Sequence, residues 1–143
     1  MTDNKKMRPG FDFIGVNVGF LCHDDKGRVL LHQRSEKCRD EHLRWDGDGG
    51  RVQFGERWEV VEETGLSITN VRFATLTNDI YTSEDMHYIT IFMIADYVSG
   101  EPEVREPDRC EEWQWFSWES MPSPLFLPIE NLLKQKFNPI THA

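Results

Sequence analysis

The sequence is short of cysteine and of long apolar runs. Its three cysteines, Cys22, Cys38 and Cys110, are odd in number and far apart. They form neither a disulfide framework nor the paired spacing of a zinc site, so we expect reduced thiols and a cytoplasmic protein. No apolar run approaches the roughly 20 residues of a membrane-spanning helix. Residues 1–10 contain lysines without an apolar run after them, unlike a signal peptide.

Positive charge is also scarce relative to negative charge. The 143 residues include 25 acidic and 16 basic side chains, which gives a formal net charge of -9 at pH 7. Nucleic-acid polymers and anionic membrane surfaces would be repelled, so neither is an expected partner. A small phosphorylated ligand remains compatible if metal ions neutralise the site locally. The length fits one domain, residues 1–143, in which residues 1–10 are expected to be flexible.

Strand patterns dominate the chain. The polar, glycine-rich stretches 35–50 and 99–111 predict long loops, and residues 23–28 predict a hairpin turn around Lys26-Gly27. The order of β-rich and helical segments suggests a mixed sheet with helices packed on it. The predicted strands cover residues 11–22, 28–34, 68–80, 86–98 and 111–118.

The end of the chain, residues 127–137, is expected to be a helix, because Pro128 stands near its first turn and its apolar residues share one face. Those residues are Ile129, Leu132, Leu133 and Phe137.

In the predicted strand 111–118, aromatic residues alternate with Gln114, which favours a packed strand over a base-stacking platform. They are Trp113, Trp115 and Phe116. The five histidines show no ligand spacing and are interpreted as structural or surface residues.

The segment GGRVQFGERWEVVEETGL, residues 49–66, combines glycines with a dense group of carboxylates. Glu59, Glu62 and Glu63 are spaced so that on a helix they share one face within an arc of about 100°. Three like charges there are unfavourable unless a cation compensates them, and carboxylate oxygens suit Mg²⁺ or Mn²⁺. Taken alone, such a run is more often a solvated helix face. The double glycine before it, which allows close backbone approach, and Gly65, which ends a helix, favour a ligand site.

This segment resembles the Nudix box, the signature G-x5-E-x7-R-E-U-x-E-E-x-G-U of a phosphohydrolase family, in which U is a bulky apolar residue. Gly50 and Glu56 fit its first part, and EVVEETGL, residues 59–66, fits its last part. The similarity extends over most of residues 12–138 and is strongest to MutT-type nucleoside triphosphate diphosphatases. The resemblance implies an α/β Nudix fold, in which a mixed β-sheet is sandwiched between α-helices.

The box is shorter than the family pattern by six residues, because only Arg57 separates Glu56 from the position of the Arg-Glu pair. In one alignment Trp58-Glu59 replaces that pair. In another, slightly favoured here, GERWE matches a common family start and the pair itself is among the lost residues. Losing six helical residues shortens a helix by about 9 Å and rotates one end by roughly 120° relative to the other. A third explanation is that the printed sequence omits six residues of the protein.

The resemblance implies a metal site and a substrate site. Metal ligands would be Glu56, Glu59, Glu62 and Glu63, with the carbonyl of Gly49 as an extra ligand. Glu59 and Glu62 would also take part in catalysis, and a general base is drawn from the box or from a later acidic loop, where Glu106 and Asp108 are weak candidates. Arg34 and Arg51 could clamp phosphates, with plain surface charge as the alternative. Phe126 and Leu125 could edge a nucleobase pocket, and core packing explains them equally well.

The expected activity is metal-dependent hydrolysis of a pyrophosphate bond in nucleoside diphosphate-linked compounds. Cleavage of a modified or ordinary nucleoside triphosphate to monophosphate and pyrophosphate leads, and an ADP-ribose or nucleotide-sugar pyrophosphatase is second. The shortened box makes a catalytically dead nucleotide-binding module the main rival, followed by a purely structural domain. The expected cofactor is Mg²⁺ or Mn²⁺, the partner is a small nucleotide, and a homodimer is left open.

Overall fold

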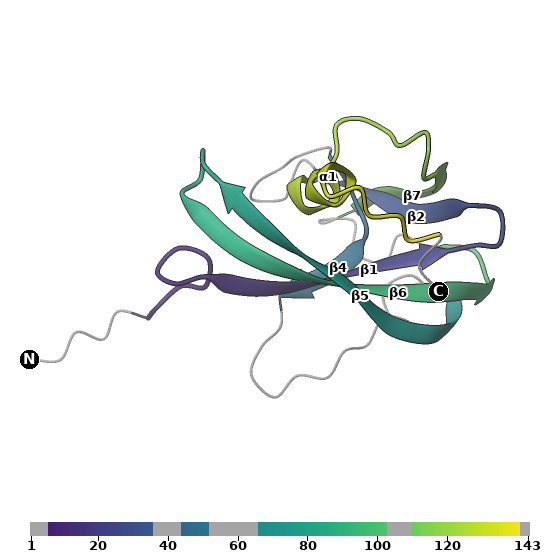
Figure 1. Ribbon diagram of the computed structural model, residues 1–143, viewed down its shortest axis with the longest axis horizontal. Helices are drawn as coiled ribbons and strands as arrows, with labels where there is room; N and C mark the ends of the chain where they lie inside the picture. Colours follow the sequence, from purple (N-terminus) through teal and green to yellow (C-terminus); the bar gives the residue numbers. More distant parts are fainter. Residues whose placement is uncertain (1–5, 36–43, 52–65, 103–109, 141–143) are drawn as a thin grey trace, which may run out of the picture.

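The computed structural model describes residues 6–35, 44–51, 66–102 and 110–140. Within these residues the chain forms seven strands and one helix (Figure 1). The elements are β1 Gly15–His23, β2 Arg28–Arg34, β3 Trp45–Asp46, β4 Asp48–Arg51, β5 Ser67–Tyr81, β6 Met86–Ser99, β7 Cys110–Ser117 and α1 Leu127–Lys134.

The sheet is mixed, as predicted. Its strand order is β3-β2-β1-β6-β5, with β4 also paired to β1 and β7 also paired to β2. β1 runs parallel to β6 along its whole length, whereas the other pairings are antiparallel. β1 and β2 form the predicted hairpin, yet their register joins only His23 to Val29. Beyond that pair β1 takes β4 as its neighbour and β2 takes β7, so the sheet splits into two branches.

The prediction of a long loop over residues 35–50 is wrong at its end. Residues 45–46 form β3 and residues 48–51 form β4. These strands are two and four residues long and rich in glycine and aspartate, so their own propensity does not favour a strand. They are strands because β2 and β1 offer backbone partners. Residues 36–43 lie outside the described residues.

Helix α1 covers one face of the sheet, as Figure 1 shows. Ile129 and Leu132 are fully buried and pack against Phe92, Leu21 and Ile94 from the sheet. Each buried aliphatic side chain contributes about 1.5–3 kcal/mol to folding, so this face fixes the helix firmly. Leu133 and Phe137 pack against the same cluster. The predicted helix is therefore confirmed, with its last turn ending at Lys134.

A buried carboxylate also fastens α1 to the sheet. Asp79 on β5 is fully buried, and its carboxylate accepts hydrogen bonds from Thr77, Thr90 and the side-chain amide of Asn131. The amide of Gln135, one turn further on, donates to the carbonyl of Leu76. The position of the helix along β5 is thus set by directional bonds as well as by apolar packing.

The residues before β1 form a loop at one end of the sheet. The hydroxyl of Tyr88 donates to the carbonyl of Pro9 at 2.9 Å, and the backbone N–H of His87 donates to the carbonyl of Gly10 at 2.8 Å. Gly10 has φ +84°, and a Cβ there would lie 2.2 Å from the Tyr88 ring, so the loop needs glycine at this position. This part of the segment that was expected to be flexible is tied to the sheet, and residues 1–5 lie outside the described residues.

The predicted packing of the aromatic strand β7 is confirmed. Trp113 stacks on His32, Trp115 meets Tyr97 edge-on, and Phe116 meets Trp45 edge-on. Cys22 is buried. In the described part of the chain, no helix has the length and apolar character needed to cross a membrane.

Candidate functional site

The double glycine lies beside the central strand of the sheet. β4 pairs with β1 so that Gly49 stands opposite Gly19 and Gly50 opposite Val18. Gly47, just before β4, would place a Cβ 2.7 Å from the carbonyl oxygen of Phe20, so this approach requires a glycine. Of the predicted metal ligands, the structure describes only Gly49, whose backbone on β4 lies opposite the middle of β1. Arg51 ends β4 opposite Asn17.

The carboxylates of the box, Glu56, Glu59, Glu62 and Glu63, lie outside the described residues, as do Glu106 and Asp108. Among the residues that the structure does describe, no group of three or more His, Cys, Asp or Glu side chains could hold a metal ion. The predicted metal site is therefore neither assembled nor excluded by the described geometry.

Both ends of the box segment are nevertheless placed. Its first end continues from Arg51 on β4, beside β1. Its last apolar residue, Leu66, is 2% exposed and packs with Cys22 and Leu30. Since Cys22 and Leu30 belong to β1 and β2, the segment starts and finishes on the same central strands. Residues 52–65, between these two ends, lie outside the described residues.

Two residues predicted to bind substrate, Arg34 and Phe126, meet in the structure. The guanidinium carbon of Arg34 lies 4.4 Å from the centroid of the Phe126 ring, a cation–π contact. Arg34 ends β2 after a bulge, and Phe126 precedes α1. A guanidinium, a group that can bind phosphate, therefore lies against a flat aromatic ring. The ring centroid of Tyr81, the last residue of β5, lies 6.2 Å from that of Phe126.

Backbone pairing positions Phe126. The N–H of Phe126 donates to the carbonyl of Trp45 at 2.8 Å, and the N–H of Trp45 donates to the carbonyl of Pro124 at 2.9 Å. Arg44 adds a bond from its side chain to the carbonyl of Leu125 at 2.9 Å, and its guanidinium lies 3.6 Å from Glu130 on α1. The short strand β3 therefore joins the end of β2 to the start of α1.

Sequence reasoning missed two residues of this site, Asp46 and His32. The Asp46 carboxylate lies 3.7 Å from the Arg34 guanidinium and 3.8 Å from the His32 ring. Asp46 stands in a glycine-rich stretch that suggested only a loop, and His32 alternates with apolar residues as any strand residue would. Its place opposite Asp46 depends on the register of β2 and β3, which no local pattern indicates.

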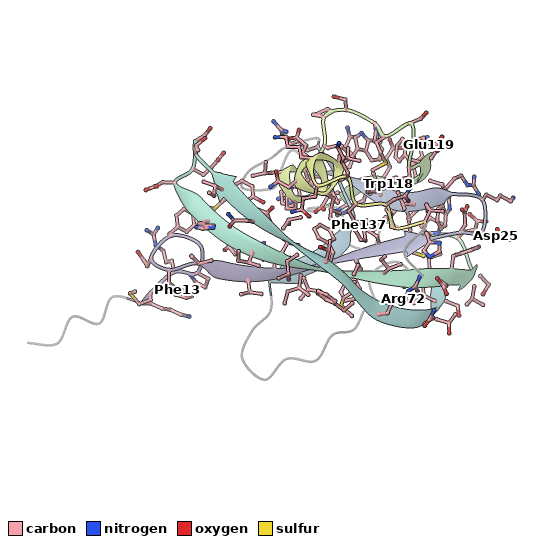
Figure 2. All side chains as sticks on the ribbon, in the orientation of Figure 1. Phe13, Asp25, Arg72, Trp118, Glu119 and Phe137 are labelled. Carbon is pink, nitrogen blue, oxygen red and sulfur yellow. The ribbon has the colours of Figure 1, made fainter. Side chains whose placement is uncertain are left out.

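Two carboxyl groups with a lowered pKa, those of Asp24 and Asp96, lie outside the cluster of Arg34, Phe126, Asp46 and His32. Burial alone would raise the pKa of Asp24, but hydrogen bonds from the backbones of Arg28 and Lys26 and from the Arg28 side chain lower it on balance. Burial opposes the same outcome at Asp96, whose pKa is lowered by hydrogen bonds from Asn70 and Arg72. Figure 2 shows Arg72 at the end of the molecule opposite Phe13. These shifts therefore concern stability at that end of the sheet.

Comparison with known proteins agrees with this architecture. The family model of the NUDIX domain matches residues 14–136. The oxidized purine nucleoside triphosphate hydrolase of Mus musculus is 34% identical over 107 residues, which cover 66% of each chain. The chain thus spans just under two thirds of that curated relative.

Two solved structures are similar to most of the chain. The MutT NUDIX hydrolase of Burkholderia pseudomallei is 30% identical with a TM-score of 0.73, covering 85% of this chain and 96% of that one. The MutT protein of Methanosarcina mazei Go1 is 25% identical with a TM-score of 0.68, covering 85% and 91%. Because the family model matches residues 14–136, most of the chain, the chain belongs to the NUDIX family.

Proposed function

We propose that this protein hydrolyses a pyrophosphate bond in nucleoside diphosphate-linked compounds. The observation that carries the proposal is the position of the two ends of the box: its glycines lie on β4 beside β1, and Leu66 packs against Cys22 of β1 and Leu30 of β2. A carboxylate-rich segment anchored at both ends on one sheet can present several oxygen ligands in one place. That is the arrangement that divalent metal ions need.

The carboxylates of Glu56, Glu59, Glu62 and Glu63 would hold Mg²⁺ or Mn²⁺, with the Gly49 carbonyl as a further ligand. When bound, such an ion supplies charge neutralisation of the pyrophosphate and a more acidic attacking water. Glu59, Glu62 or Glu106 would accept the proton of that water. Carboxylate and carbonyl oxygens are hard donors, and they bind these ions in preference to softer metal ions.

The substrate proposed first is a nucleoside triphosphate, cleaved to monophosphate and pyrophosphate. The name of the mouse relative, an oxidized purine nucleoside triphosphate hydrolase, supports this class. Arg34 would bind phosphate, because a guanidinium matches phosphate oxygens in a bidentate manner, with Arg51 as a second candidate. Phe126 would border the base. We also propose a cytoplasmic location, because the three cysteines are odd in number and far apart in the sequence.

The test is the variant Glu63→Gln, which keeps the side-chain shape and removes an anionic ligand. If the protein is active, its turnover of nucleoside triphosphates with Mg²⁺ or Mn²⁺ should fall by about 10² or more, with folding little changed. The matched control is Glu119→Gln at an exposed residue of the loop between β7 and α1 (Figure 2), which should keep full turnover. Equal turnover of Glu63→Gln and the parent protein would show that this cluster is not the metal site.

A further inference from the structure

His32 is a half-buried histidine whose two ring nitrogens are both buried. On the sheet it stands opposite Asp46 of β3 on one side and Trp113 of β7 on the other. The Trp113 ring stacks on the imidazole, with centroids 4.6 Å apart and planes 21° apart. The His32 side chain is 14% exposed, and neither ring nitrogen has a hydrogen-bond partner among the described residues. A buried polar group without a partner is costly, so this arrangement calls for a reason.

Asp46 faces two basic side chains without being hydrogen-bonded to either. Its Oδ2 atom lies 3.8 Å from His32 Nε2 and 3.7 Å from Arg34 Nη1, and N–H···O hydrogen bonds are about 2.7–3.2 Å long. The Asp46 and Arg34 side chains are each 19% exposed, so solvent screens their attraction only in part. A small movement could close either pair, and one carboxylate oxygen serves both.

The charge of these three residues depends on the imidazole. With His32 neutral, the charges of Arg34 and Asp46 cancel. With His32 protonated, the three residues carry a net charge of about +1. An anion that approaches Arg34 competes with Asp46 for the guanidinium, and it is bound better when Asp46 can turn to a protonated imidazole instead. Because linkage is reciprocal, anion binding must then also favour protonation of His32.

We infer that His32 is a positioning residue that takes up a proton when a phosphate-bearing ligand binds Arg34, so that Asp46 passes from Arg34 to His32. The proton comes from solvent, and no covalent bond of the ligand changes. The inference rests on the proposed function, in which Arg34 binds phosphate. Three neighbours of His32 are described. Asp46 of β3 lies within ion-pair distance of its ring, and Arg34, on the same strand as His32, faces the same carboxylate. Trp113 of β7 contributes an uncharged ring.

The test is calorimetry of inorganic pyrophosphate binding with Mg²⁺, in two buffers of different ionisation enthalpy, for the parent protein and His32→Gln. Glutamine can still donate to Asp46 but cannot take a proton. The parent protein should take up more protons on binding than His32→Gln near neutral pH. Pyrophosphate's own change in protonation is the same in both titrations, so it drops out when the two proton uptakes are subtracted. Its affinity should also fall more steeply with rising pH, by up to about tenfold per pH unit where an imidazole deprotonates.

Two further variants make the result decisive. His87→Gln, at a half-buried histidine that contacts Asn78, should behave like the parent protein. Asp46→Asn removes the shared carboxylate and should lose the extra proton uptake even if His32→Gln folds poorly. In turnover assays His32→Gln should flatten the pH dependence of KM and leave that of kcat unchanged.

Equal proton uptake by the parent protein, His32→Gln and Asp46→Asn would overturn the inference and leave the proposed function standing. Failure of the parent protein to bind pyrophosphate or any nucleotide would overturn both. The two failures are therefore distinguishable in one set of titrations.

Discussion

Arg34 is held by different chemistry on two sides. Its guanidinium lies over the Phe126 ring at 4.4 Å and faces the Asp46 carboxylate at 3.7 Å. A planar cation suits both contacts, since it can stack on a ring while its edge forms parallel hydrogen bonds to an oxyanion. Lysine would keep the charge but lose the stack and the fork, so the exchange separates geometry from charge.

We expect Arg34→Lys to raise KM for nucleotides by about tenfold or more, equivalent to roughly 1.4 kcal/mol, with a smaller effect on kcat. Steady-state kinetics measures both. The control is Arg8→Lys, because Arg8 also lies over a phenyl ring, that of Phe11, but is 61% exposed in the N-terminal loop. An unchanged KM in Arg34→Lys would remove Arg34 from the substrate site.

At the scale of elements, the β1–β2 turn is built around one carboxylate. Asp24 accepts hydrogen bonds from the backbone N–H groups of Lys26 and Arg28 and from Arg28 Nε. These bonds lower its pKa against the opposing effect of burial. A carboxyl group with a lower pKa in the folded state binds fewer protons there than in the unfolded state. Its contribution to stability is present above the ordinary pKa and is lost as the pH falls through the folded value.

Asp24→Asn should therefore lower the free energy of unfolding at neutral pH by about 1–2 kcal/mol. It should also flatten the fall in stability below about pH 4, near the ordinary aspartate value of 3.8. Denaturant unfolding at pH 7 and at pH 3–4 measures both effects. Asp25→Asn, at the exposed neighbouring residue labelled in Figure 2, should change neither. A parallel loss of stability in both variants at all pH values would contradict this account of the turn.

Elements with their own periodicity could be predicted from the sequence. β2 occupies residues 28–34 as expected, and β5, β6, β7 and α1 lie within a few residues of their predicted positions. β3 and β4 could not be predicted, because neighbouring strands, rather than local propensity, make them strands. For the same reason Arg34 and Phe126 could be named separately as substrate residues, whereas their contact, and the roles of Asp46 and His32, depend on pairings between distant segments.

At the scale of the whole molecule, the proposed function requires that the folded protein, whose net charge is -9, binds a divalent metal ion. A ligand that binds only the folded state stabilises it by RT ln(1 + [L]/Kd), about 2.7 kcal/mol at one hundred times Kd. Millimolar Mg²⁺ or Mn²⁺ should therefore raise the melting temperature by a few degrees, and Glu63→Gln should reduce that rise. No shift with either metal would count against a formed site.

The shortened box bears on the whole account, because the family places seven residues where this chain has one. A helix shorter by about 9 Å cannot keep Glu56 and the Glu62-Glu63 pair in their usual relative places unless the preceding loop moves. Hydrolysis by the 143-residue chain is therefore expected to be weak or absent. Intact-mass measurement of the natural protein decides whether six further residues are present.

The most direct measurement is the metal-dependent release of pyrophosphate and nucleoside monophosphate from nucleoside triphosphates. It should compare the 143-residue chain with a version carrying a six-residue helical segment, ending in Arg-Glu, between Glu59 and Val60. We expect hydrolysis with Mg²⁺ or Mn²⁺ in the lengthened chain, none without metal, and a much slower rate in the 143-residue chain. Equal rates in the two chains would contradict the interpretation of the gap. Absence of metal-dependent hydrolysis from both would contradict the proposed function itself.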